Sequence, residues 1–192
     1  EGSDLITGGA FEDSITGGIG NDTIIGGDQD DTITGGVGAD VFAYAVATTN
    51  ATDTNVDLIT DAFNGADVFD FTDLTAGSLR GDGDTFASGN GTSAQSLGAN
   101  VGLYVATNAA ASFAEADIYT ALSGIADDLA ASDILYVMIS NNTDARLVKI
   151  TETANTGTLV AADDAMVFVA RLSGVTAATL ATLTEGNFAD FS

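Results

Sequence analysis

Five aspartates recur at intervals of nine residues near the start of the chain: Asp4, Asp13, Asp22, Asp31 and Asp40. A carboxylate repeated at a fixed interval is suited to binding a hard cation through oxygen ligands. Among the acidic residues of the whole chain, 23 are Asp and 5 are Glu. Asp tolerates tight turns, whereas a solvated acidic face would use Glu freely. The acidic residues therefore point to turns that aim carboxylates at a metal ion.

A large apolar residue follows each of these aspartates two places later: Ile6, Ile15, Ile24, Ile33 and Phe42. Most units also open with Gly-Gly, as in GGIGNDTII. A flexible Gly/Asp linker would explain the glycines but not the fixed apolar position. Two signals with one unbroken period identify a structural repeat.

Each unit has about six turn-prone residues and then three strand-prone ones, such as Thr23–Ile25. Side chains alternate along a strand, so the middle residue of the triplet points inward. Nine residues then make a half-turn, and eighteen return the chain beside itself, about 4.8 Å away. The pattern predicts a mainly β fold that begins as a parallel β-roll. Ile6, Ile24 and Phe42 would lie in one sheet, with Ile15 and Ile33 in the facing sheet.

The same spacing places Asp4, Asp22 and Asp40 in one column, and Asp13 and Asp31 in another. Two carboxylates 5 Å apart repel by roughly 1 kcal/mol in water and by about 3–4 kcal/mol at an effective dielectric constant near 20. Each half-turn also buries one apolar side chain, which stabilises the folded stack by roughly 1.5–3 kcal/mol. We therefore expect the metal-free stack to be marginal or unfolded. A hard dication held by carboxylates and carbonyls would reverse that balance, and oxygen-only ligation suits calcium.

The composition excludes several classes of function. The net charge is −24, and residues 1–79 contain no Lys or Arg, which argues against nucleic-acid binding. The chain has no Cys and no His, so thiolate chemistry, the Ser-His-Asp triad and the usual zinc site are absent. No apolar run reaches the roughly 18–20 residues of a transmembrane segment. We do not expect an enzyme within these residues, because nothing groups catalytic side chains.

The units resemble the glycine-rich nonapeptides of the repeats-in-toxin (RTX, hemolysin-type calcium-binding) family, G-G-x-G-x-D-x-U-x. The resemblance implies a parallel β-roll with Ca²⁺ between neighbouring loops, held by the aspartate and by carbonyls of the first, second and fourth loop residues. Within the five units it marks these metal-site residues: Gly2, Asp4, Gly8, Gly9, Asp13, Gly17, Gly18, Gly20, Asp22, Gly26, Gly27, Asp31, Gly35, Gly36, Gly38 and Asp40.

Two units depart from the family pattern at the fourth position, where Phe11 and Gln29 replace glycine. Both loops fall on the Asp13/Asp31 side. We therefore predict well-formed sites in the Asp4/Asp22/Asp40 column and a weaker or altered site between Asp13 and Asp31.

The segment Val56–Leu74 resembles the sequence that follows the last repeat in this family. Its matching residues are Asp57, Asp61, Phe63, Gly65, Asp67, Phe69 and Asp70, with Ala62 inserted before the phenylalanine. The resemblance makes Asp57 and Asp67 candidate ligands of one further calcium site. The alternative is an acidic hairpin that buries Phe63, Phe69 and Phe71.

We expect four parts: a calcium-binding β-roll at 1–43, a cap at 44–75, a surface loop at 76–100 and a C-terminal domain at 101–192. The last part is predicted to be β-rich with one or two helices, and Arg146 and Lys149 are expected to point outward. The ending EGNFADFS loosely resembles the uncleaved C-terminal signals of type I export. The chain starts within a repeat, so we expect more protein upstream, and the signal implies that Ser192 is the natural terminus.

Two functions remain open. The first is a calcium-binding structural module of a secreted or cell-surface bacterial protein, such as a surface layer or adhesin, that folds on extracellular calcium after type I export. Its expected partners are calcium, the type I secretion apparatus, and either further copies in a sheet or filament or cell-surface polysaccharide. The alternative is the calcium-binding and secretion tail of a secreted protease, lipase or polysaccharide epimerase. The Ala/Thr/Gly-rich, Lys-poor composition favours the first.

Overall fold

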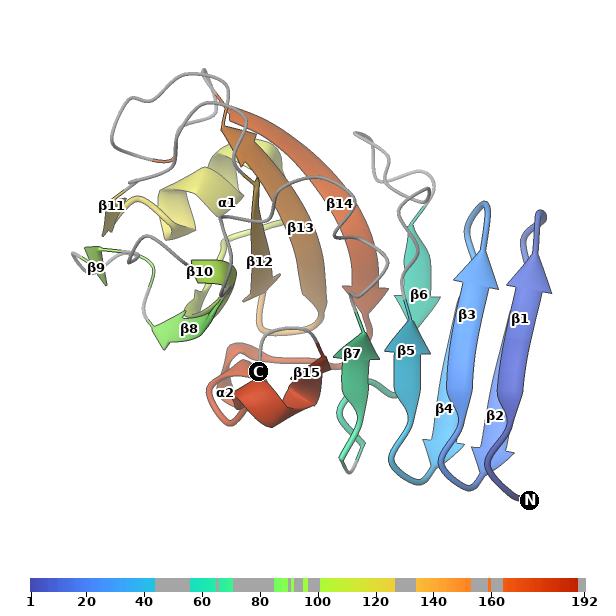
Figure 1. The fold of residues 1–192 in the computed structure, drawn as a ribbon. Coiled ribbons are helices and arrows are strands. Elements are labelled where there is room, and N and C mark those ends of the chain that lie inside the picture. The colour runs from blue at the N-terminus through green and yellow to red at the C-terminus, as the bar shows by residue number, and fades with distance from the viewer. Residues whose placement is uncertain are drawn as a thin grey trace.

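The computed structural model describes residues 1–43, 56–64, 66–70, 85–89, 91, 95–96, 101–126, 134–152, 159 and 164–189. These residues form mainly β-strands, with two short α-helices among them. Figure 1 shows the N-terminal strands stacked at one end of the molecule, and the longer C-terminal strands and the helices at the other.

The first five strands form a parallel β-roll. They are β1 (Leu5–Gly9), β2 (Ser14–Ile19), β3 (Thr23–Gly27), β4 (Thr32–Val37) and β5 (Val41–Ala43). In one sheet Ile6 pairs with Ile24, and Ile24 pairs with Phe42. In the other sheet Ile15 pairs with Ile33. The predicted fold and the predicted division of the apolar residues between the two sheets are confirmed.

Two further strands, β6 (Asp57–Ile59) and β7 (Val68–Asp70), continue the roll by one turn. β6 adds to β4 and β7 adds to β5, both in parallel. Because the two strands belong to different sheets, they do not form the hairpin that the sequence left open. Phe63 and Phe69 do pack in the core, as that alternative required. Phe71 and Gly65 lie outside the described residues.

The C-terminal elements are β8 (Thr85–Gly89), β9 (Gln95–Ser96), β10 (Val101–Ala109), α1 (Glu115–Ala121), β11 (Ile125–Ala126), β12 (Ile134–Ser140), β13 (Ala145–Glu152), β14 (Asp164–Leu172), α2 (Ala177–Leu180), a 3₁₀ turn (Glu185–Asn187) and β15 (Phe188–Ala189). The larger sheet has the order β2-β4-β6-β14-β13-β12-β10-β8, and the smaller has the order β1-β3-β5-β7-β15. Both roll sheets therefore continue into strands from the end of the chain.

These two sheets run across the ranges expected as separate parts. Strand β8 lies inside the range 76–100, so at least Thr85–Gly89 is sheet rather than surface loop. Phe188, expected near an export signal, is buried in β15, where it pairs with Phe69 of β7. Asp190 and Phe191 of the same ending lie outside the described residues. The division into domains stays a prediction.

The C-terminal part of the larger sheet is covered on both faces. Leu103, Tyr136 and Met138 share a core cluster with Leu180 of α2, and this cluster continues into the interior of the roll. On the other face, Tyr104 and Val137 pack in a second cluster with Ile118 and Leu122, which α1 places there. The packing of α1 and α2 on opposite faces follows from the alternation of side chains along β10 and β12.

Arg146 does not point outward as expected. Its side chain is buried, and its guanidinium lies 4.1 Å from the ring centre of Phe113. Strand β13 alternates regularly, so Arg146 shares a face with Val148, in the cluster beneath α1, whereas Lys149 lies on the opposite face. Two residues separated by an odd number of positions in one strand cannot share a face.

None of the helices in the described part of the chain has the length and apolar character needed to cross a membrane.

Phe69 links the roll to the C-terminal strands. It is fully buried, and its ring lies 5.4 Å from Phe42, 5.2 Å from Phe63 and 6.5 Å from Phe188. We predict that Phe69→Ala lowers the free energy of unfolding by about 3–5 kcal/mol, since a large cavity forms where the roll meets β15. Urea denaturation in calcium measures the change. Phe11→Ala is the control, because Phe11 is 75% exposed and its loss should change stability by no more than about 0.5 kcal/mol. Equal effects of the two variants would contradict this role for Phe69.

Candidate metal centre

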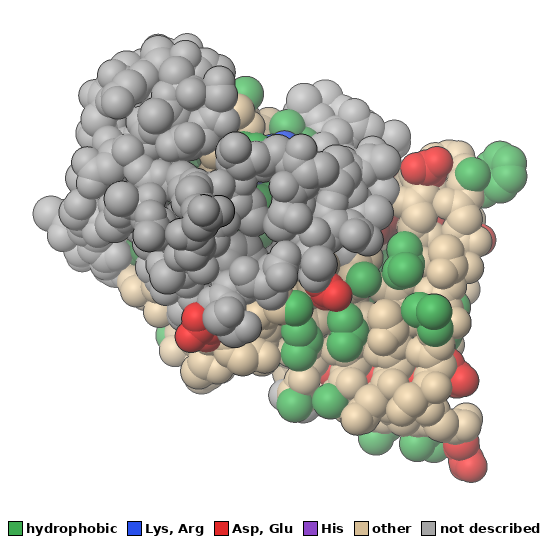
Figure 2. Space-filling view, viewed as in Figure 1, with side chains coloured by type: hydrophobic (Ala, Val, Ile, Leu, Met, Phe, Trp, Pro, Cys, Tyr) green, Lys and Arg blue, Asp and Glu red, His purple; other side chains and the backbone are tan. Residues whose placement is uncertain are grey.

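The aspartates form two columns, one on each side of the roll. On one side the backbone N–H of Asp4 donates to Asp22 Oδ1, that of Asp22 to Asp40 Oδ1, and that of Asp40 to Asp67 Oδ1, at 2.9, 2.9 and 3.1 Å. On the other side Asp13 N–H donates to Asp31 Oδ1 at 2.9 Å, and Asp31 N–H to Asp57 Oδ1 at 3.1 Å. Figure 2 shows acidic side chains at the two ends of the roll strands, where these loops lie.

The second carboxylate oxygen has no such partner at the centre of each column. Asp22 is 0% exposed and Asp31 is 1% exposed, and the Oδ2 atom of each is buried with no hydrogen-bond partner. Residues 1–79 supply no Lys or Arg to neutralise these charges. An uncompensated buried carboxylate costs several kcal/mol. A cation bound at these unpartnered oxygens would neutralise the buried charge.

The first glycine of each unit leaves room beside these oxygens. A Cβ atom on Gly17 would lie 2.5 Å from Asp22 Oδ2 and 2.6 Å from the carbonyl oxygen of Gly35. A Cβ atom on Gly8 would likewise meet Asp13 Oδ2 and the Gly26 carbonyl oxygen. A carboxylate oxygen of one turn and a carbonyl oxygen of the next thus converge on the same small space. Hard oxygen donors of this kind suit Ca²⁺.

Among the described residues, no three acidic side chains come together as a metal-binding group. The predicted ligand set, in which glycine carbonyls complete each site, stays a prediction.

The remaining predicted glycines shape the loops. Gly2, Gly9, Gly18, Gly20, Gly27, Gly36 and Gly38 all have φ between 109° and 155°, a region that favours glycine. A Cβ atom on Gly20 would also collide with the Gly2 carbonyl, and one on Gly38 with the Gly20 carbonyl. Successive loops on the Asp4/Asp22/Asp40 side therefore stack backbone to backbone, a contact that only glycine allows.

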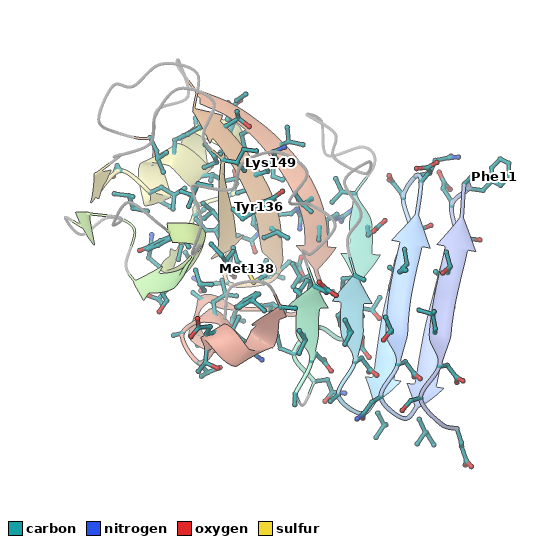
Figure 3. The ribbon with its side chains drawn as sticks, viewed as in Figure 1. Phe11, Tyr136, Met138 and Lys149 are labelled. Carbon is teal, nitrogen blue, oxygen red and sulfur yellow. The ribbon has the colours of Figure 1, made fainter. Side chains whose placement is uncertain are left out.

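The Asp13/Asp31 side differs at its fourth position. Gln29 adopts a φ of 74°, and its side-chain Nε2 donates to the Ala10 carbonyl of the loop before it at 2.6 Å. Phe11 projects from the loop between β1 and β2 (Figure 3). Asp28 and Glu12 are exposed, whereas Asp30 has a buried, unpartnered Oδ1. The predicted inequality of the two sides stays a prediction. The structure adds that the altered side has a non-glycine residue, Gln29, with a positive φ.

Asp57 and Asp67 extend different columns, so they do not share one further site. Asp57 lies beyond Asp31, and Asp67 lies beyond Asp40, because β6 and β7 enter opposite sheets. A Cβ atom on Gly26 would meet Asp31 Oδ2 and would lie 3.1 Å from Asp57 Oδ2. Two carboxylates thus face the same space. Burial, assisted by the charges of Asp31 and Asp30, raises the pKa of Asp57 to about 7.

Asp67 is held differently. Its Oδ2 accepts the backbone N–H of Asn64 at 2.9 Å, so both of its oxygens have protein partners. Burial, with the charge of Asp40, still raises the pKa of Asp67 above its usual range. Burial also raises the pKa of Asp31. In all three cases the protein disfavours the charged form that a bound cation would stabilise.

Sequence reasoning named Asp61 only as a match to the family pattern and gave it no role. In the structure its Oδ1 accepts Gly35 N–H at 2.9 Å and its Oδ2 accepts Gly36 N–H at 2.8 Å. The inserted Ala62, next to Phe63 with its φ of 64°, is the local signal that this loop departs from the nonapeptide.

The match of the repeats to a family model agrees with this geometry. Residues 7–42 match the RTX calcium-binding nonapeptide repeat in four copies. No curated protein matches the chain. Solved structures similar to it include the R3 subunit of a mannuronan C5-epimerase from Azotobacter vinelandii, at 19% identity and a TM-score of 0.49, covering 100% of this chain and 74% of that one. The R2 subunit of the same enzyme matches at 19% identity and a TM-score of 0.41, covering 98% and 92%.

The N-terminal part of the chain is therefore a calcium-binding β-roll. More particularly, residues 7–42 are RTX repeats, and their metal is Ca²⁺.

Filling the space beside Asp22 tests where the metal lies. Gly17 does not have a positive φ, so an alanine there acts through its close contacts, which are with Asp22 Oδ2 and Cβ and with the Gly35 carbonyl. We predict that Gly17→Ala removes one bound calcium ion, counted by titration calorimetry. Gly186→Ala is the control, since its Cβ would lie 3.7 Å from its nearest neighbour, Thr184 Oγ1. An unchanged calcium count in Gly17→Ala would rule out a metal ion in this space.

Asp57→Asn should have opposite effects with and without calcium. Without calcium, it removes a buried charge that faces Asp31 while keeping an acceptor for Asp31 N–H, so the sheet content in chelator should rise. With calcium, it removes a ligand charge, so calcium affinity should fall. Far-UV circular dichroism in chelator and calcium titration measure the two effects. Asp28→Asn, at an exposed side chain, should change neither. A gain or a loss in both conditions would show that Asp57 does not face a cation.

Proposed function

We propose that this chain is a calcium-dependent structural module of a secreted or cell-surface bacterial protein, one that acts in a surface layer or as an adhesin. It folds on extracellular calcium after type I export. The observation that carries the proposal is the pair of aspartate columns, whose central Oδ2 atoms are buried and unpartnered. Asp22 Oδ2 shares its space with the Gly35 carbonyl oxygen, and Asp31 Oδ2 shares its space with Asp57 Oδ2.

Calcium acts as a compartment switch in this proposal. In the cytosol the ion is scarce, and repulsion within the columns keeps the repeats unfolded and able to pass through an exporter. Extracellular calcium modules have dissociation constants of about 10⁻⁴–10⁻³ M. At about 1 mM calcium, a site with a dissociation constant of about 10⁻⁴ M stabilises the fold by about 1.4 kcal/mol. Each further site of this affinity stabilises the fold by the same amount.

The C-terminal elements support a structural role. Strands β14 and β15 pair with β6 and β7, so the last turn of the roll is covered on both sheets by the same polypeptide. Among the described strands, β1 and β2 are the first in their sheets at the other end, near residue 1 (Figure 1). The expected partners are further copies of the chain in a sheet or filament, or cell-surface polysaccharide.

Removal and return of calcium test the proposal. In chelator the far-UV circular dichroism spectrum should lose sheet signal, and millimolar calcium should restore it. Magnesium is the control ion, because it demands near-ideal octahedral geometry and sheds its waters reluctantly. The same spectrum in chelator and in calcium would refute calcium-dependent folding.

Assembly separates this role from the alternative, a calcium-binding export tail of a secreted enzyme. A surface-layer module should form ordered sheets or filaments when calcium is added, visible by electron microscopy and sedimentation. A tail should stay monomeric. Calcium-dependent folding without assembly would favour the tail, and a protease, lipase or epimerase sequence upstream would establish it.

A further inference from the structure

The ladder between β4 and β6 is shorter than the ladder between β2 and β4. β2 and β4 stay in register as far as Ile19 and Val37. β6 ends at Ile59, opposite Ile33, and one more backbone bond joins Thr60 N–H to the Ile33 carbonyl. The N–H groups of Gly35 and Gly36 therefore lie beyond the end of the neighbouring strand.

The carboxylate of Asp61 accepts these two N–H groups, as the backbone of a longer strand would. One oxygen accepts Gly35 N–H at 2.9 Å and the other accepts Gly36 N–H at 2.8 Å. In the columns, by contrast, Asp22, Asp31 and Asp40 each accept one N–H from the preceding turn, through Oδ1. Hydrogen bonds to a carboxylate are roughly twice as strong as neutral ones.

The Gly36 N–H belongs to the same peptide group as the Gly35 carbonyl. A peptide group is planar and trans, so its N–H and C=O point in opposite directions. The Gly35 carbonyl oxygen lies on the Gly17 side, 2.6 Å from where a Cβ of Gly17 would be, beside Asp22 Oδ2. Asp61 thus accepts the N–H of this peptide group, and the C=O of the same peptide group faces the space we assign to calcium. We call this space, bounded by Gly17, Asp22 Oδ2 and the Gly35 carbonyl, the Asp22 site.

We infer that Asp61 is a positioning residue for the Asp22 site, acting through the Gly35–Gly36 peptide. The inference rests on the proposed calcium binding. By accepting Gly36 N–H, the carboxylate orients the Gly35 carbonyl and increases its negative charge, which makes the oxygen a better ligand for a hard cation. Partners outside the ligand shell that orient a metal ligand are typically worth about 10–100-fold in metal affinity.

Hydrogen bonds made by Asn64 fix the loop around Asp61 against Gly36. Asn64 N–H donates to the Asp61 carbonyl at 3.2 Å and to Asp67 Oδ2 at 2.9 Å, and Asn64 Nδ2 lies 3.4 Å from the Gly36 carbonyl. The loop therefore contacts both sides of Gly36. A loop that served only as a chain reversal would need none of these contacts to Gly35 and Gly36.

Asp61→Asn tests the role with little change in shape. Calcium titration calorimetry of the full chain should show at least about tenfold weaker binding at one site, with the other sites unchanged. The matched control is Asp144→Asn, because Asp144 Oδ1 also accepts a backbone N–H, that of Gly174 at 2.9 Å, but this bond joins two residues of the C-terminal part and touches no glycine of the roll. A merely structural cap would lower the melting temperature without changing calcium affinity, and that result would overturn the inference.

A second measurement does not depend on a variant. When calcium in the wild-type protein is replaced by strontium, the NMR resonances of the Gly35 carbonyl, the Gly36 amide and the Asp61 carboxyl should shift together. Unshifted Asp61 and Gly36 resonances would overturn the inference, even if Asp61→Asn fails to fold. If the wild-type chain binds no calcium, the proposed function itself fails. If it binds calcium and Asp61→Asn binds equally well, only the role of Asp61 fails.

Discussion

Buried carboxylates without a compensating positive charge are the constraint on which this structure depends. Asp22, Asp31 and Asp40 are each at most 1% exposed, and residues 1–79, which include all the strands of the roll, contain no Lys or Arg. Each aspartate receives one backbone hydrogen bond from the turn before it, which positions the carboxylate but does not neutralise it. The apolar core inside the roll is one residue wide, so it cannot offset several unpaired charges by burial alone. In the function proposed above, calcium is therefore part of the folded state rather than an addition to it.

The C-terminal strands cover the end of the repeat stack. A roll that simply stopped would leave two unpaired strand edges. Here β14 and β15 pair with β6 and β7, and Phe188 meets Phe63 and Phe69 in the same core cluster that fills the roll. Because the core is continuous, stability gained in the C-terminal strands is transmitted to the last turn of the roll. The turns nearer residue 1 have no such pairing with β14 or β15 among the described residues.

The sequence predicted the roll, its two sheets and its two columns because all three depend on one period. Nine residues fix which apolar side chain points inward and which aspartates align, so local chemistry suffices. The contacts of the C-terminal part depend on long-range pairing, which has no period. Nothing local indicates that Phe188 would pair beside Phe69, or that Arg146 would be buried against Phe113. Asp57 and Asp67 were recognised as candidates, but their assignment to opposite columns depends on which sheet each short strand joins.

The two columns end in different ways, and the difference has a physical consequence. On one side the last carboxylate, Asp67, has both oxygens bonded to backbone N–H groups, from Asp40 and Asn64. The protein itself therefore offsets part of the charge there. On the other side Asp57 faces Asp31 across the space beside Gly26, and burial and these neighbours raise its pKa to about 7. The side that departs from the family pattern at Phe11 and Gln29 is thus also the side where two buried carboxylates, those of Asp31 and Asp57, face one space at the inner end of the column.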